Sequence, residues 1–129
     1  MRPPLVVDCS MLAGRLFHEE WKQQAADIVA GRTLHAPQLL VTEITSVALK
    51  KHKRGMAEIA LEGLQAFALL DIQLHAVAQP AQVLALALRY QLSACDASYL
   101  WLAAELKAPL ATFDQLLATA AGEHLGSLD

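Results

Sequence analysis

The chain has 129 residues, a formal net charge of −3 at pH 7 and a hydrophobic content of 55%. A chain of this length is large enough for one hydrophobic core, so we expect a single domain over residues 1–129. The negative charge argues against a protein that binds nucleic acid through its overall field. It leaves only a local basic patch or a contact made through a metal ion.

The amino terminus and the apolar runs bear on the location of the protein. No apolar run approaches the roughly 18 residues that cross a bilayer, and residues 1–5 lack the apolar region of a signal peptide. We therefore expect a cytoplasmic protein without a membrane partner. The two cysteines, Cys9 and Cys95, are too few for a disulfide framework and have no ligands at metal spacing, so we expect both to be small buried residues.

The first half of the chain begins with a short apolar run, Leu5-Val6-Val7, which is too short for a helix and rich in β-branched residues. It is typical of a buried central strand. The run over 39–54 has apolar residues at helical spacing and ends before Gly55. The predicted elements of this half are strands over 5–7 and 34–36 and helices over 10–17, 19–30 and 39–54.

The second half continues the alternation of helices and strands, with Pro80 and Ser93 marking two helix starts. Alternating elements favour a mostly parallel sheet covered by helices on both faces, and we expect about five strands. The predicted elements here are helices over 56–70, 80–90 and 94–106, a helix after Asp114, and strands over 71–77, 110–112 and 124–128.

Four acidic residues follow strands or begin helices. Asp8 and Asp114 each follow a predicted buried strand, whereas Glu43 and Asp96 fall in the first turns of helices that start at the same edge. An acid at such a position often only caps a helix or complements its dipole. Because the carboxyl ends of parallel strands share one edge of a sheet, we expect these four acids to converge there.

Convergence of four carboxylates has a chemical consequence. The charges would repel one another and raise each other's pKa unless a cation neutralised them. Oxygen ligands select hard divalent cations, so the sequence predicts a site for Mg²⁺ or Mn²⁺. A water molecule on such an ion is available as a nucleophile.

The chain resembles a PIN domain of the VapC toxin type in four short motifs. The motifs are Val7-Asp8-Cys9-Ser10, Thr42-Glu43, residues 95–100 and residues 110–117. The resemblance implies a three-layer α/β/α fold with a parallel sheet and a Mg²⁺- or Mn²⁺-dependent ribonuclease. It also implies homodimers and a cognate VapB-type antitoxin, as in type II toxin-antitoxin systems.

The resemblance assigns roles residue by residue. Asp8, Asp96 and Asp114 would hold one or two metal ions, and Glu43 would orient or deprotonate the attacking water or hold a second ion. The hydroxyl neighbours of the acids in this pattern are Ser10 and Thr112. Cys95 departs from the pattern, because an aromatic residue often stands before the third acid.

The one basic cluster, residues 50–54, lies at the end of a predicted helix. Lys50 and Arg54 lie close to one stripe with Glu43, so they could line the approach of RNA to the carboxylates. The alternative is that these cations complement the carboxyl end of the helix.

Two other classes of protein share features with this sequence. A receiver-type phosphoacceptor domain would need adjacent acids on the first strand, which carries only Asp8. A non-catalytic PIN-like module that binds proteins remains an alternative, because the chain has a surplus of aliphatic residues.

Four aromatic residues in apolar helix stripes are expected in the core or at an interface rather than stacked on bases: Trp21, Tyr90, Tyr99 and Trp101.

Overall fold

The computed structural model describes residues 2–17 and 19–128. In this part of the chain seven helices and four strands follow one another. They are β1 (Pro4–Val7), α1 (Cys9–Leu16), α2 (Lys22–Val29), β2 (Thr33–Pro37), α3 (Leu39–Lys53), α4 (Ala57–Leu69), β3 (Ile72–His75), α5 (Pro80–Tyr90), α6 (Ala94–Leu106), β4 (Leu110–Ala111) and α7 (Gln115–Gly126).

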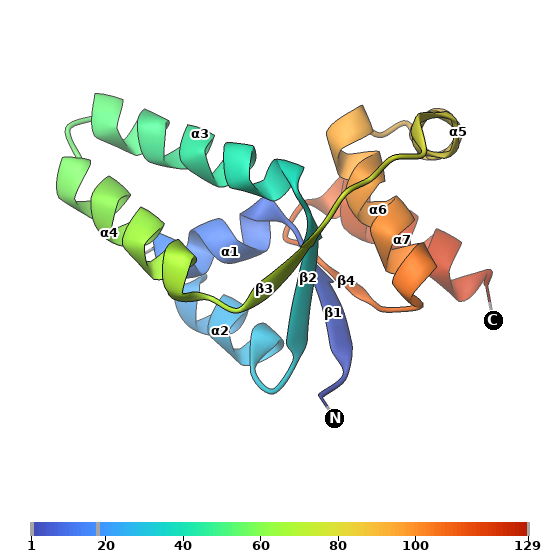
Figure 1. Cartoon of the computed structure of the whole chain (residues 1–129), viewed down its shortest axis with the longest axis horizontal. Coiled ribbons are helices and arrows are strands. Elements are labelled where there is room, and N and C mark those ends of the chain that lie inside the picture. Colours follow the sequence, from blue (N-terminus) through green and yellow to red (C-terminus); the bar gives the residue numbers. More distant parts are fainter. Residues whose placement is uncertain (1, 18, 129) are drawn as a thin grey trace.

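The four strands form one parallel sheet in the order β3-β2-β1-β4. The first strand is central, as predicted, and Val6 pairs with His35 of β2 on one side and with Leu110 of β4 on the other. Figure 1 shows the sheet between α1 to α4 on one side and α5 to α7 on the other. The predicted three-layer α/β/α fold is thereby confirmed, and the carboxyl ends of all four strands lie at one edge of the sheet.

The predicted fifth strand over 124–128 is wrong, because α7 continues through Gly126. Leu117, Ala120 and Ala121 are buried on one side of α7, so this segment gains its burial as a helix rather than as an edge strand. The prediction for Cys95 is also wrong. Its side chain is exposed, since it lies in the first turn of α6 on the solvent side.

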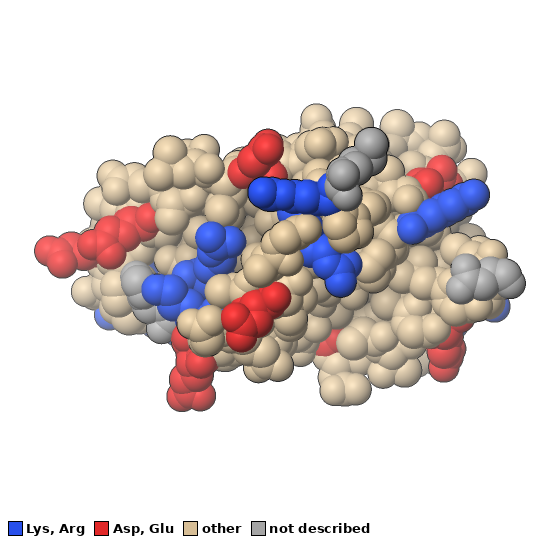
Figure 2. Space-filling view, turned by 90° about the horizontal axis from the view of Figure 1, so that it is seen from below, with Lys and Arg blue, Asp and Glu red and all other residues tan. Residues whose placement is uncertain are grey.

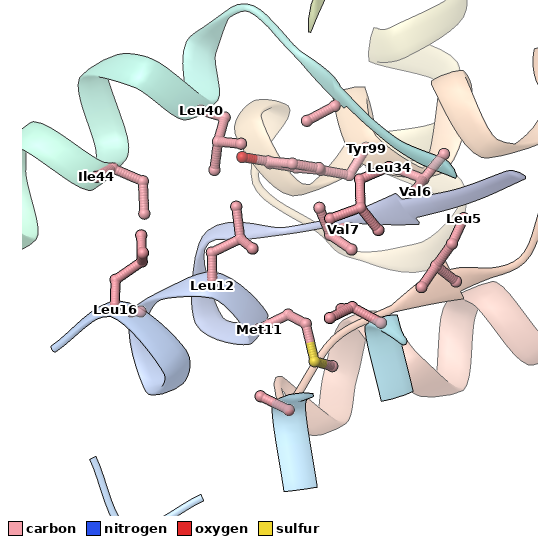
Figure 3. Packing of buried hydrophobic residues seen from close by; sticks show 14 of the residues in the cluster. Leu5, Val6, Val7, Met11, Leu12, Leu16, Leu34, Leu40, Ile44 and Tyr99 are labelled. Carbon is pink, nitrogen blue, oxygen red and sulfur yellow. The ribbon is translucent and has the colours of Figure 1, made fainter. Parts of the chain in front are cut away.

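The core lies on both sides of β1. Val6 and Val7 have no exposed surface, and they contact α1 and α6 residues in one large apolar cluster. Figure 3 shows the ring of Tyr99 lying across this cluster together with Leu12 and Leu40. A second, smaller cluster is built from α5, α6 and α7. Because β1 is covered on both faces, the residue that follows it is held in a rigid setting.

Charged side chains of both signs lie on one face of the molecule. Figure 2 shows lysine and arginine side chains interspersed with acidic ones over the face that it draws, without one continuous basic area. None of the helices in residues 2–17 and 19–128 combines the length and the apolar character that a bilayer span requires.

Two glycines on helices test the packing in opposite ways. An alanine at Gly63 in α4 would overlap the ring of Phe17, which is 2% exposed, whereas an alanine at Gly122 in α7 would meet no neighbour. Overpacking a core costs about 1–3 kcal/mol, and alanine gains about 1 kcal/mol over glycine inside a helix.

We therefore expect Gly63→Ala to lower the free energy of unfolding by about 1 kcal/mol and Gly122→Ala to raise it by up to about 1 kcal/mol. Urea denaturation followed by circular dichroism measures both. Equal stabilisation by the two substitutions would contradict the close contact between α4 and Phe17.

Candidate metal-dependent site

Asp8 is the residue directly after β1 and the N-cap of α1. Its Oδ1 accepts a hydrogen bond of 3.1 Å from the backbone N–H of Met11. The side chain is only 5% exposed, which is unusual for an aspartate. A buried carboxylate at the end of a central strand therefore needs further polar partners.

Two hydroxyl groups supply those partners. Ser10 Oγ donates to Oδ1 of Asp8 at 2.7 Å, and Thr112 Oγ1 donates to Oδ2. Thr112 comes directly after β4, the strand that pairs with β1, so the sheet register brings the two residues together across the chain. Each oxygen of the Asp8 carboxylate thus accepts a hydrogen bond from a hydroxyl group.

Asp114 lies two residues beyond Thr112 and is exposed. Its backbone N–H donates to Thr112 Oγ1 at 3.0 Å, and its Oδ1 caps α7 by accepting from the backbone N–H groups of Leu116 and Leu117. The same threonine therefore contacts Asp8 through its proton and Asp114 through its oxygen. The cap occupies only one of the two carboxylate oxygens of Asp114.

Glu43 lies in the second turn of α3 and is half-buried. Its Oε1 accepts a hydrogen bond of 2.5 Å from the hydroxyl of Tyr99, whose ring is 1% exposed. The sequence interpretation placed Tyr99 in the core and missed this contact. The available signal was its spacing, because Asp96 and Tyr99 are three residues apart on α6 and share one face of it.

Asp96 lies in the first turn of α6, after the Ser93 cap that the sequence predicted. Ser93 Oγ accepts a hydrogen bond of 3.0 Å from the backbone N–H of Asp96. The charge of Asp96 acts on both Asp8 and Glu43, and the charge of Asp114 acts on Asp96. All four sequence-predicted acids are therefore close enough to interact electrostatically with at least one other.

The pKa values of three acids are raised above their usual values. For Asp8 the main cause is burial, opposed by hydrogen bonds from Thr112, Ser10 and Met11. Burial also raises the pKa of Glu43, with a smaller contribution from the charges of Asp96 and Asp8. The pKa of Asp96 is raised by burial and by the charge of Asp114. Each shift disfavours the negative form of an acid at this edge.

The donor chemistry of the site fits a hard divalent cation. The four acids present only oxygen atoms, and none of them forms an ion pair with lysine or arginine in the described residues. In residues 2–17 and 19–128 no group of three or more His, Cys, Asp and Glu side chains is arranged to hold a metal ion. Glu43 accepts its hydrogen bond from Tyr99, and Asp114 accepts from the backbone at the start of α7.

The two basic residues proposed to face RNA lie at the far end of α3. Lys50 and Arg54 are both exposed, and Arg54 is the C-cap of the helix. The charge of Lys50 lowers the pKa of the neighbouring Cys9 thiol, but burial, Glu43 and Asp8 outweigh it and raise that pKa to about 12. Lys50 thus lies within electrostatic reach of the acidic edge. Cys9 stays protonated and packs against the core.

Comparison with known proteins agrees with this geometry. The family described as PIN domain matches residues 5–123. The crystal structure of PAE2754 from Pyrobaculum aerophilum has a TM-score of 0.74 and 19% sequence identity, over 98% of this chain and 86% of that one. At that identity the likeness supports the fold alone, and no curated protein gives a significant match. Because the family match spans most of its length, the chain belongs to the PIN domain family.

Proposed function

We propose that the protein is a Mg²⁺- or Mn²⁺-dependent endoribonuclease, the toxin of a VapC-type toxin-antitoxin pair. PIN domains have a nuclease-type fold and commonly use divalent metal ions. The observation that carries the proposal is a set of four interacting carboxylates at the edge of the sheet where the parallel strands end, none of which forms an ion pair with a lysine or arginine among residues 2–17 and 19–128. In open α/β sheets this edge is where ligands bind.

In this proposal Asp8, Asp96 and Asp114 hold the metal through their carboxylate oxygens. A bound divalent ion would lower the pKa of a water molecule and offset the charge that develops on the phosphate. Ser10 and Thr112 donate to the two oxygens of Asp8 and so oppose the effect of burial, which raises the pKa of this carboxyl group. An ionised Asp8 is the form that a cation needs.

Glu43 is the proposed general base. Its raised pKa brings the carboxylate nearer to neutral pH, where a group can both accept and release a proton. The hydrogen bond from the hydroxyl of Tyr99 fixes the position of one Glu43 oxygen. We propose Tyr99 as a positioning residue, since it acts only through Glu43.

Lys50 and Arg54 are proposed to contact the RNA backbone. The net charge of the chain is −3, and charged residues on the face drawn in Figure 2 are mixed in sign, so phosphate binding by this protein needs a local contact of this kind. Both side chains are exposed on α3, the helix that carries Glu43 at its other end.

A VapB-type antitoxin and a second copy of the chain are the proposed protein partners. The support is apolar surface on α3 and α4, where Leu49 is 53% and Leu61 57% exposed beside a groove of about 200 Å³. A cytoplasmic location, which the RNA substrate would require, stays a prediction.

The same apolar surface favours a second candidate, a PIN-like module that binds protein and has lost catalysis. The two candidates differ in one property. A module of this kind has no need for a saturable metal site, so calorimetric titration with Mn²⁺ separates them.

The nuclease predicts that purified protein cleaves cellular RNA in the presence of Mn²⁺ or Mg²⁺ and that Asp96→Asn lowers the rate by at least about 100-fold, because a metal ligand is lost. Gel analysis of total RNA measures this. Asp71→Asn is the matched control, since Asp71 is exposed at the amino end of β3, on the opposite edge of the sheet. Cleavage by Asp96→Asn at the wild-type rate would refute the assignment.

The acidic edge also predicts how stability responds to pH without metal. Asp96 has a raised pKa in the folded state, so its charge destabilises the protein above that pKa but has no effect below the usual value of 3.8, where the group is protonated in both states. Asp96→Asn should raise the Tm at pH 7, and the gain should vanish toward pH 3.

The metal proposal adds a second measurement to the same variant. Mn²⁺ should raise the Tm of the wild type at pH 7 and have little effect on Asp96→Asn, because binding to the folded state alone stabilises it. Differential scanning fluorimetry with and without a chelator measures both effects. Equal Mn²⁺ stabilisation of the two proteins would remove Asp96 from the ligand set.

The basic cluster predicts a change in salt dependence. Replacing both Lys50 and Arg54 with alanine should weaken RNA binding and flatten the plot of log Kd against log salt by about one phosphate contact per residue. Fluorescence anisotropy at several salt concentrations measures the slope. Lys107→Gln is the control, because Lys107 is the exposed C-cap of α6, shortly before the start of β4. An unchanged slope in the double variant would refute the proposed RNA contact and would favour the alternative, in which these cations complement the carboxyl end of α3.

A further inference from the structure

A pocket of about 420 Å³ opens beside the acidic edge, lined by Ser10, Trp21, Phe113 and Asp114. Its volume falls within the range of about 300–1,000 Å³ that is usual for small-molecule sites. We infer that this pocket binds one base of the RNA strand, next to the phosphate that is cleaved. The inference rests on the proposed ribonuclease and names how that site would hold its substrate.

The walls of the pocket have the chemistry that single-stranded RNA requires. Trp21 and Phe113 are half-buried and meet edge to face, with ring centroids 6.1 Å apart and planes at 60°. Unpaired bases are bound in proteins by stacking on aromatic side chains of this kind. The sequence interpretation placed Trp21 in a helix stripe, whereas the structure has it as the N-cap of α2, before the helix begins.

Ser10 connects both aromatic residues to the acidic edge. Its Oγ donates to Asp8 at 2.7 Å and accepts from the backbone N–H of Phe113 at 2.9 Å. Its backbone oxygen accepts from Nε1 of Trp21 at 3.4 Å. One residue thus fixes the pocket wall relative to the carboxylate at the centre of the site, so a base in the pocket would set the register of the backbone on the acids.

Gly14 gives the Trp21 ring its place. An alanine at this buried position of α1 would overlap the indole at Cδ1 and Nε1, so the ring lies against the bare backbone of the helix. The indole is therefore held from one side by Gly14 and tied to Ser10 through its N–H. A ring that is already ordered loses little conformational freedom when it binds a ligand.

Charge selects the part of the RNA that can enter. Asp114 lines the pocket, and Asp8 lies behind Ser10, so a phosphate group would be repelled there. A base is neutral and mostly apolar on its faces, so it can occupy the pocket while the phosphate stays at the edge with the metal. The competing occupant of the pocket is an aromatic side chain of a protein partner. A pocket built for such a side chain would not need to bind a nucleic-acid base.

The first test uses adenosine and ribose as probes, and it needs neither metal nor cleavage. In a Trp101→Phe background Trp21 is the one remaining tryptophan, since the chain has two. Adenosine should quench its fluorescence in a saturable way and ribose should not. The same titration of Trp21→Phe, which retains Trp101, should give no saturable quenching. Equal quenching of Trp101, or none of Trp21, would overturn the inference.

The second test uses cleavage kinetics. Trp21→Leu and Phe113→Leu each remove a stacking surface while keeping an apolar side chain, so KM should rise by about tenfold with kcat nearly unchanged. Trp101→Phe, whose indole in the wild type donates to exposed Gln82, is the control and should change neither constant. Unchanged KM in both leucine variants, with circular dichroism confirming their fold, would also overturn the inference.

The two tests separate this inference from the proposed function. If the wild type cleaves no RNA with any divalent metal but adenosine quenches Trp21, the proposed base pocket is supported and the proposed ribonuclease activity is refuted. If RNA is cleaved but adenosine has no effect on Trp21, the ribonuclease stands and the base pocket falls.

Discussion

The buried carboxylate of Asp8 depends on hydroxyl donors that come from two separated parts of the chain. Burial favours its neutral form and raises its pKa, whereas a hydrogen bond to a charged group contributes about 1.5–3 kcal/mol, so the donors limit how far that pKa rises. Ser10 lies on the helix that follows β1, and Thr112 lies just after β4. The pairing of two strands and the charge of one carboxylate therefore depend on each other.

The rest of the edge is organised by repulsion. Glu43 and Asp96 lie near the starts of two different helices, yet the chain folds so that the charge of Asp96 disfavours the negative form of Glu43. The large apolar cluster around β1 supplies the free energy that holds them there. The surplus of negative charge at this edge lowers the free energy of unfolding. Clusters of like charge with perturbed pKa values are common at functional sites.

The acids could be predicted from the sequence because the carboxyl ends of parallel strands share one edge of a sheet. Three apolar residues were enough to predict the strand that ends before Asp8. Sequence reasoning missed the role of Tyr99, since a tyrosine in an apolar stripe looks the same whether its hydroxyl has a partner or not. It also predicted a strand over 124–128, whereas α7 continues through Gly126 and Ser127 is its C-cap. The helix ends at Gln91 and Lys107 adopt the left-handed conformation without a glycine, so no local residue pattern marks them.

β4 has only two residues and forms one border of the sheet, and this shapes how copies of the protein can meet. A strand this short presents few unpaired backbone groups to another chain, which protects this border of the sheet from strand addition. A second copy that met the protein at this border would have to contact helical faces, whose side chains can be changed by substitution without exposing the backbone. The acidic edge beside so short a strand is therefore not covered by strand addition from another chain through β4.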